Sequence, residues 1–190
     1  MLSDFSKKYP RLRKLVTSRF LFKINPNYIT FLAFLMACFA GYFFYISSFI
    51  LASLFVLLNG FFDILDGEIA RKYNINSKLG DFLDHTLDRL ADIAILLGIT
   101  LSSAVPDIIG FSLIIVTLLV SYLGTQAHAL TKKRFYGGII GRADRIIIIF
   151  VASVGMMLFE KSLYYGVLLL ILLSFVTFLQ RFYIIYKQLK

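Results

Sequence analysis

The sequence predicts an all-α protein that crosses a membrane several times. Hydrophobic residues make up 59% of its 190 positions and charged residues only 16%, a composition unlike that of a soluble domain. Several uncharged runs approach or exceed the length of about 20 residues that a helix needs to cross a bilayer. Between two such runs, residues 63–88 contain six acidic residues, although the net charge of the chain is +9. The fold has to account for these acids.

The first 24 residues predict a helix that lies on the membrane surface. Apolar residues recur there at steps of three and four among seven Lys and Arg, at Leu2, Phe5, Tyr9, Leu12, Val16 and Phe20. This amphipathic pattern is typical of an interfacial helix. We expect residues 25–190 to form a six-helix transmembrane bundle, so that the chain 1–190 is a single membrane domain.

Six spans are expected from the apolar runs. Residues 28–62 carry no charge and are long enough for two helices, separated at Ser47-Ser48. The later runs are residues 90–105, 108–131, 146–159 and 162–180. The run 146–159 is short, so its helix should begin earlier, between Gly138 and Ala143.

The charges outside the spans predict the orientation. With six spans, eighteen Lys and Arg fall on the side of the two termini, and only Lys161 falls on the other side. Because positively charged loops stay in the cytoplasm, the termini and residues 63–88 should face the cytoplasm of a cell-membrane protein.

Helical spacing arranges the acidic stretch into two faces. One face, on the second span, carries Asp63, Asp66, Gly67 and Ala70, and the other, on the third, carries Gly80, Asp84 and Asp88. Residues three and four apart share a helix face. Because the connection between the two helices is short, we expect them to be antiparallel neighbours with their carboxylates face to face.

Carboxylates in this position require compensation. An Asp at the centre of a membrane helix costs roughly 2.5–3.5 kcal/mol, and less near the interface. Oxygen ligands without His or Cys at ligand spacing favour Mg²⁺ or Mn²⁺. Such ions complete their coordination with water and phosphate, which indicates a phosphate-bearing substrate. Gly67, Ala70 and Gly80 leave room for it, and Arg71 can pair with its phosphate oxygens.

The motif Asp63-x2-Asp66-Gly67-x2-Ala70-Arg71-x8-Gly80-x3-Asp84-x3-Asp88 resembles, at all eight fixed positions, that of the CDP-alcohol phosphotransferases. The resemblance implies transfer of a phosphatidyl-type group from a CDP-linked lipid to an alcohol, with release of CMP. It implies two divalent cations on Asp63, Asp66 and Asp84, with Asp88 as the general base. The CDP-lipid would contact Asn27, Thr30, Gly67, Ala70, Arg71 and Gly80. A homodimer is also implied, and no nucleic-acid partner is expected.

The acceptor is predicted from the second basic loop. Its charges include Lys132, Arg142 and Arg145, which suit the phosphate of an anionic acceptor better than a neutral one such as serine. Residues 141–145 are similar to the corresponding stretch of the branch that uses inositol phosphate, which includes archaetidylinositol phosphate and phosphatidylinositol phosphate synthases. We therefore expect myo-inositol phosphate as the acceptor, with glycerol 3-phosphate as the alternative. A cation pathway or transporter is a distant alternative, because acids within spans alone would suit it.

Overall fold

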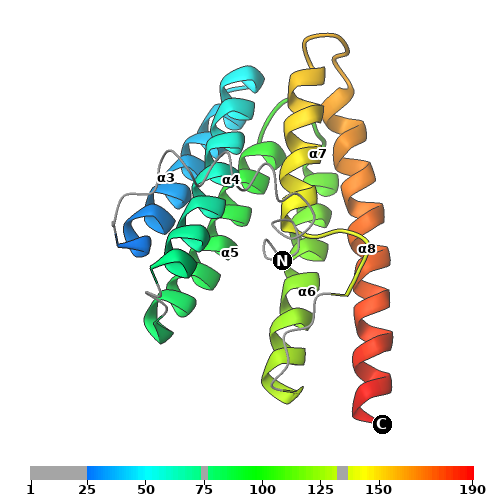
Figure 1. The fold of residues 1–190 in the computed structure, drawn as a ribbon. Helices are drawn as coiled ribbons and strands as arrows, with labels where there is room; N and C mark the ends of the chain where they lie inside the picture. Colours follow the sequence, from blue (N-terminus) through cyan, green and yellow to red (C-terminus); the bar gives the residue numbers. More distant parts are fainter. Residues whose placement is uncertain (1–24, 74–76, 132–136) are drawn as a thin grey trace.

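The structure is a computed structural model that describes residues 25–73, 77–131 and 137–190 and is helical in each of these parts. Its helices are α3 (Pro26–Tyr45), α4 (Phe49–Lys72), α5 (Lys78–Thr100), α6 (Asp107–Thr131), α7 (Arg142–Gly155) and α8 (Ser162–Leu189). Successive helices run in opposite directions, so α3 begins at the end of the bundle where α8 finishes (Figure 1). The interfacial helix predicted for residues 1–24 lies outside the described residues.

Local signals in the sequence set the helix ends. Asn25 caps α3 by accepting a hydrogen bond from the Asn27 amide at 3.1 Å, and Pro26 begins the helix, a position that proline favours. The predicted break at Ser47-Ser48 is present, and Ser47 has a left-handed φ of 58°. Ser77 caps α5 through the Gly80 amide at 2.9 Å. Helix α7 begins at Arg142, within the predicted range, but ends at Gly155, four residues before the end of the run.

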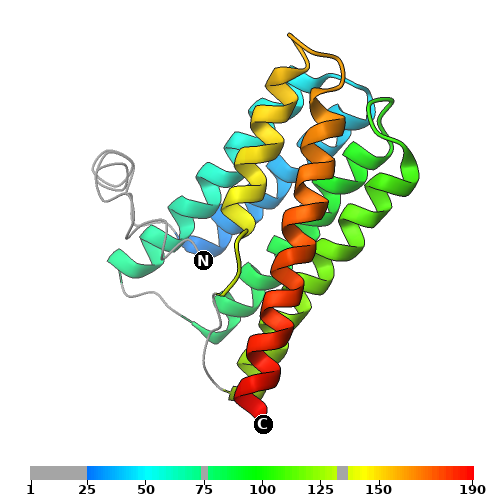
Figure 2. The ribbon, with the colours of Figure 1, turned by 90° about the vertical axis from the view of Figure 1, so that its right-hand side faces the viewer.

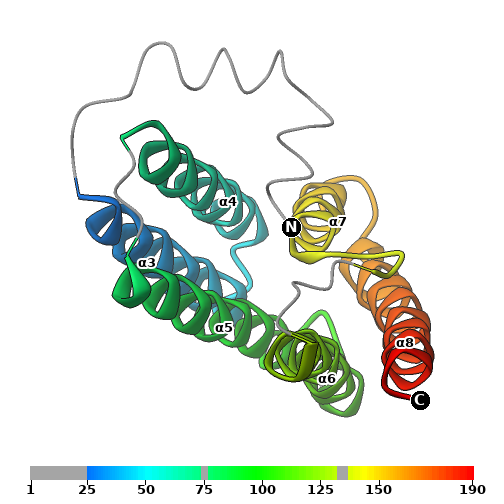
Figure 3. The same ribbon diagram turned by 60° about the horizontal axis from the view of Figure 1, so that its bottom comes forward.

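The helices form a closed ring. Helix α3 packs against α4 and α5, α7 packs against α4 and α8, and α6 packs against α5 and α8. The view along the bundle shows this order around the ring (Figure 3), and the side view shows α7 and α8 next to each other (Figure 2). The ring encloses the core and the charged site described below.

The prediction that the two helices carrying the acids, α4 and α5, pack directly against each other is wrong. Helices α4 and α5 are not among the closely packed pairs, and each packs instead against α3. Small residues on α3 permit this arrangement: the backbone of Gly41 approaches α5 so closely that a Cβ on Gly98 would lie 2.1 Å from the Gly41 carbonyl oxygen. The acidic faces of α4 and α5 are therefore brought together by side chains and not by close packing of the two helices.

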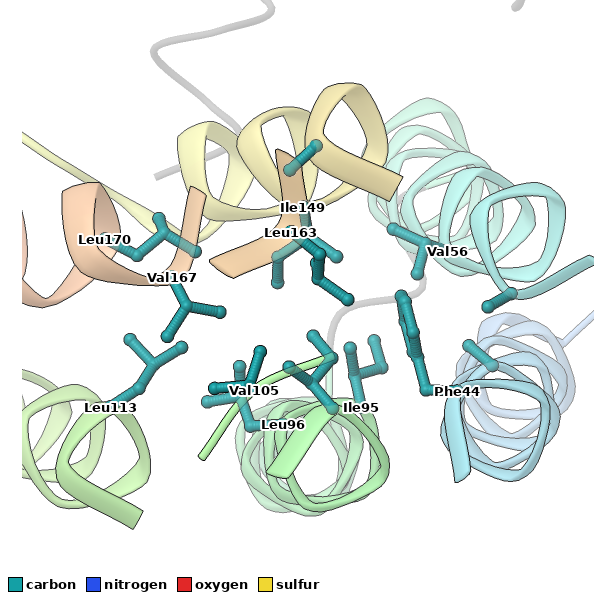
Figure 4. Close-up of a cluster of buried hydrophobic side chains, with 14 of the residues drawn as sticks. Phe44, Val56, Ile95, Leu96, Val105, Leu113, Ile149, Leu163, Val167 and Leu170 are labelled. Atoms are coloured by element: carbon teal, nitrogen blue, oxygen red, sulfur yellow. The ribbon is translucent and has the colours of Figure 1, made fainter. Parts of the chain in front are cut away.

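The apolar core fills the end of the bundle that lies away from the acids. Phe44, Val56, Ile99 and Leu163 are fully buried there, and Figure 4 shows side chains from all six helices meeting in this cluster. The core therefore fixes the helices at one end, and the opposite end is free to hold polar groups.

Only four of the six predicted spans are supported by length and composition. Helices α3, α4, α6 and α8 are long and apolar enough to cross a membrane. Helix α5 carries Asp84, Asp88, Arg89 and Asp92 in its 23 residues. Helix α7 has 14 residues, or about 21 Å at 1.5 Å per residue, against a hydrocarbon core of about 30 Å. The two exceptions are the helices that carry Asp84, Asp88, Arg142 and Arg145 of the predicted site.

Candidate active site

The carboxylates of α4 lie inside the bundle. Asp63 and Asp66 are 6% and 5% exposed, one turn apart on the face that the spacing predicts. The Thr30 hydroxyl on α3 donates a hydrogen bond to Asp66 Oδ2 at 2.7 Å. Thr30, which we expected to contact the CDP-lipid, therefore holds one of the predicted metal ligands in place.

The carboxylates of α5 form a group of possible metal ligands. Asp84, His85 and Asp88 each offer a ligand atom, and these atoms lie within 4.8 Å of one another. His85 is exposed and lies 3.7 Å from Asp81, so it sits at the outer edge of the group. The carboxylate oxygens are hard donors of the kind that Mg²⁺ and Mn²⁺ prefer.

Arg142 of α7 joins the acidic faces of α4 and α5. Its Nη1 atom contacts the Oδ1 atom of Asp63, and also that of Asp88 at 2.5 Å, while its Nε donates to Asp92 at 3.4 Å. Because one nitrogen atom touches both Asp63 and Asp88, these two carboxylates lie side by side. The spacing of the acids predicted that the two acidic faces would meet. The positive charge of the second basic loop led us to expect Arg142 at the acceptor phosphate, and its contacts with the carboxylates were not predicted.

A second group of cations lies beyond Arg142. Arg145 is 4% exposed and donates from Nη2 to Asp92 Oδ2 at 2.6 Å. Arg181 of α8 is 5% exposed and donates to the Gly137 and Val120 carbonyl oxygens, both at 2.8 Å. Arg89 lies close enough to Arg181 for their charges to interact, as does Arg145. The result is a cluster of arginines in which those of α7 and α8 are buried and Arg89 of α5 is partly exposed.

Arg181 is the site residue that the sequence analysis missed, because it was counted only as a charge of the C-terminal tail. One signal was present. Ser174, Thr177 and Arg181 follow each other at steps of three and four in a largely apolar helix, and all three are buried. Lys132, the remaining residue predicted for the acceptor phosphate, lies outside the described residues.

The residues predicted for the CDP-lipid lie around the ends of α3, α4 and α5. Asn27 borders Gly80, since a Cβ on this glycine would lie 3.3 Å from Asn27 Oδ1. Gly67 faces the Arg71 guanidinium, which would lie 3.4 Å from a Cβ at that position. Arg71 donates to Glu68 at 2.5 Å, and Ala70 is partly buried next to it in sequence. Arg71 is thus held over the small residue that the motif requires.

Comparison with known proteins identifies the chemistry. A family model for CDP-alcohol phosphatidyltransferases matches residues 23–179. The chain belongs to this family. Among CDP-alcohol phosphatidyltransferases, it is 41% identical to the archaetidylinositol phosphate synthase of Pyrococcus horikoshii over 167 residues, which cover 88% of this chain and 86% of the relative. The corresponding enzyme of Methanothermobacter thermautotrophicus is 34% identical over 168 residues, with the same two coverages.

Solved structures of this family have the same fold. The phosphatidylinositol phosphate synthase of Mycobacterium tuberculosis, solved with CDP-DAG bound, matches with a TM-score of 0.76 and 26% identity, covering 93% of this chain and 92% of that one. The same protein in complex with manganese and citrate matches with a TM-score of 0.77 and 23% identity, covering 98% and 89% of the two chains. The present chain is therefore an integral membrane transferase of phospholipid biosynthesis.

Proposed function

We propose that this CDP-alcohol phosphatidyltransferase transfers a phosphatidyl or archaetidyl group from a CDP-linked lipid to myo-inositol phosphate and releases CMP. The observation that carries the proposal is the arginine cluster beside the acids. A phosphorylated acceptor would place negative charge beside Arg181, which donates to two carbonyl oxygens, and beside Arg145, which shares the single carboxylate of Asp92 with Arg142. The names of the relatives agree with this acceptor, and membership of the family argues against a cation pathway.

The carboxylates suit divalent cations. We assign Asp63, Asp66 and Asp84 as ligands of two ions, Mg²⁺ or Mn²⁺, because these residues bring hard oxygen atoms from α4 and α5 to the same end of the bundle. Bound there, such ions would polarise the diphosphate and stabilise the charge on the departing CMP. Thr30 keeps Asp66 turned toward the site, since its hydroxyl donates to this carboxylate.

Asp88 is the proposed general base. It takes the proton of the acceptor hydroxyl, whose oxygen then attacks the phosphorus attached to the lipid as the bond to CMP breaks. Asp88 lies next to Asp63 and touches Arg142, so it stands between the carboxylates and the arginines. Asn27, Gly67, Ala70, Arg71 and Gly80 would receive the nucleotide, and Arg142, Arg145 and Lys132 the acceptor phosphate, with Arg181 added from the structure.

The proposal includes the position of the protein in the membrane. Helix α5 packs between α3 and α6, and α7 packs between α4 and α8. We infer that both helices cross the membrane with their neighbours, shielded by the ring. The excess of Lys and Arg at the end of the termini supports a cytoplasmic site. Two copies of the chain are proposed to associate.

A test of the acceptor uses the purified protein with CDP-archaeol or CDP-diacylglycerol and Mn²⁺. CMP release is measured with myo-inositol phosphate, glycerol 3-phosphate and serine in parallel. Turnover with myo-inositol phosphate is expected, with little or none for the other two. Turnover with glycerol 3-phosphate but not with inositol phosphate would replace the proposed acceptor by the alternative.

A further inference from the structure

We propose that Asp92 is a positioning residue for the acceptor, because it holds Arg142 and Arg145 in the orientation that binds the acceptor phosphate. This inference rests on the proposed function. Asp92 lies outside the family motif, one helical turn after Asp88. It is 7% exposed, and its position inside the bundle is costly unless both of its oxygens are satisfied.

Each oxygen of Asp92 serves a different arginine. Oδ1 accepts from Arg142 Nε at 3.4 Å, and Oδ2 accepts from Arg145 Nη2 at 2.6 Å. The two arginines are three residues apart on the first turn of α7, so a single carboxylate from α5 fixes both of their side chains. Among the described residues, Asp63 and Asp88 contact Arg142 but not Arg145, and Asp92 is the carboxylate that contacts both.

The contact with Arg142 also sets its orientation. Asp92 meets Nε, whereas Asp63 and Asp88 meet Nη1. A planar guanidinium held at two different nitrogen atoms has a fixed plane. Asp92 therefore determines how Arg142 faces the base Asp88. It also determines which of the five N–H donors of Arg142 are left to bind a ligand.

Asp92 also balances the arginine cluster. Arg145, Arg142 and Arg89 all lie close enough to Asp92 for their charges to interact with it. Cations that lie close together repel one another, and without the Asp92 carboxylate this repulsion would push Arg145 away from Arg142. A carboxylate in their midst keeps them in place before the acceptor arrives, which lowers the cost of ordering the site during binding.

Kinetic constants distinguish a positioning role of Asp92 from a purely structural one. Loss of a residue that only supports the bundle should affect both substrates alike. Loss of a residue that orients the acceptor arginines should raise the KM for the acceptor and leave the KM for the CDP-lipid unchanged.

The experiment first identifies which phosphorylated acceptor the wild type uses, and then compares Asp92→Asn with wild type. We expect the acceptor KM to rise by about tenfold or more, the scale seen when groups that orient functional side chains are removed. Binding of Mn²⁺, followed by electron paramagnetic resonance, should be retained. Asp107→Asn is the matched control, because Asp107 is an exposed residue of α6.

A double-variant cycle tests the contact itself. Asp92→Asn combined with Arg145→Gln should raise the acceptor KM by less than the product of the two single effects, because both changes remove the Asp92–Arg145 contact, while the loss of the Asp92–Arg142 contact still adds to the effect of Arg145→Gln. The double variant also removes one charge of each sign, so it keeps the charge balance if Asp92→Asn alone does not fold. In that case Asp92→Glu, which keeps the charge and displaces it, should still raise the KM for the acceptor selectively.

The outcomes separate the two proposals. If the wild type uses only an unphosphorylated alcohol, the proposed function and this inference both fail. If it uses a phosphorylated acceptor but the Asp92 variants raise both KM values equally, or the cycle is additive, only the role of Asp92 is overturned.

Discussion

Replacing Arg142 by Gln tests the charge arrangement of the site. Arg142 contacts three carboxylates, those of Asp63, Asp88 and Asp92, and those of Asp63 and Asp92 are buried. Arg142→Gln keeps a polar side chain but leaves Asp63 without its guanidinium, while Arg89 stays 3.7 Å from Asp88 and Arg145 stays 2.6 Å from Asp92. Removing one partner of a buried ion pair costs about 3–5 kcal/mol. On the scale of soluble chains of 150–250 residues, this corresponds to a fall of roughly 6–20 °C in the melting temperature.

Thermal unfolding in detergent measures this loss. The chain has no Trp, so helix content is followed by far-UV circular dichroism, first in chelator and then in excess Mn²⁺. We expect the full loss in chelator and a smaller one in Mn²⁺, because a divalent cation supplies the positive charge that the variant lacks. A ligand at 100 times its Kd stabilises the folded state by about 2.7 kcal/mol, enough to recover a large part of the deficit.

Two results bear on the reasoning. Lys161→Gln, at an exposed cation of the opposite end, should change the free energy of unfolding by no more than about 0.5 kcal/mol. If Arg142→Gln lowers the melting temperature equally in chelator and in Mn²⁺, Arg142 does not act by neutralising the carboxylates, and the argument is refuted.

Three further predictions address single contacts. Thr30→Val removes the hydroxyl that donates to Asp66 and should weaken Mn²⁺ binding by about tenfold, as loss of a group that orients a metal ligand does. Asp88→Asn should abolish turnover while Mn²⁺ and CDP-lipid binding persist, measured by titration. Gly98→Ala places a Cβ 2.1 Å from the Gly41 carbonyl oxygen and should destabilise the fold by about 1–3 kcal/mol in thermal unfolding.

The controls for these predictions are also defined by the structure. Gly60→Ala adds the same atom where it meets only the Ile146 side chain, at 3.3 Å and beyond, so it should cost less than Gly98→Ala. Unchanged Mn²⁺ affinity in Thr30→Val would mean that Asp66 is not a ligand held by Thr30. Retained turnover in Asp88→Asn would reject Asp88 as the base.

Local periodicity predicted the parts of the site that depend on one helix at a time. The face that carries Asp63 and Asp66 follows from a step of three residues, and that of Asp84 and Asp88 from a step of four. These relations hold in any α-helix. The break at Ser47-Ser48 was also predictable locally, because the uncharged run of residues 28–62 is too long for one helix across the membrane. The family motif then supplied roles that spacing alone does not give.

Contacts between distant helices were not predictable in this way. A short connection suggested that α4 packs on α5, but the small side chains of α3 let this helix contact both of them. The partners of Arg142 depend on the position of α7 relative to α4 and α5. The sequence near Arg142 does not predict this position. The burial of Arg181 likewise depends on carbonyl groups at Gly137 and Val120, far away in the chain.

The buried charges are better explained by function than by stability. The side chains of Asp63, Asp92, Arg142 and Arg145 are charged and buried in the site. Replacing a buried ion pair by well-packed apolar side chains is often neutral or stabilising, so stability alone gives no reason to keep these four charges in a membrane bundle. They contact one another across α4, α5 and α7, whereas the buried side chains of the main core cluster are apolar (Figure 4). Since Arg142 contacts both the proposed base and the acidic face of α4, a change at the metal ligands must alter the arginines that face the acceptor. We therefore expect the affinities for Mn²⁺ and for the acceptor to depend on each other, and Arg142 is the residue through which this coupling would pass.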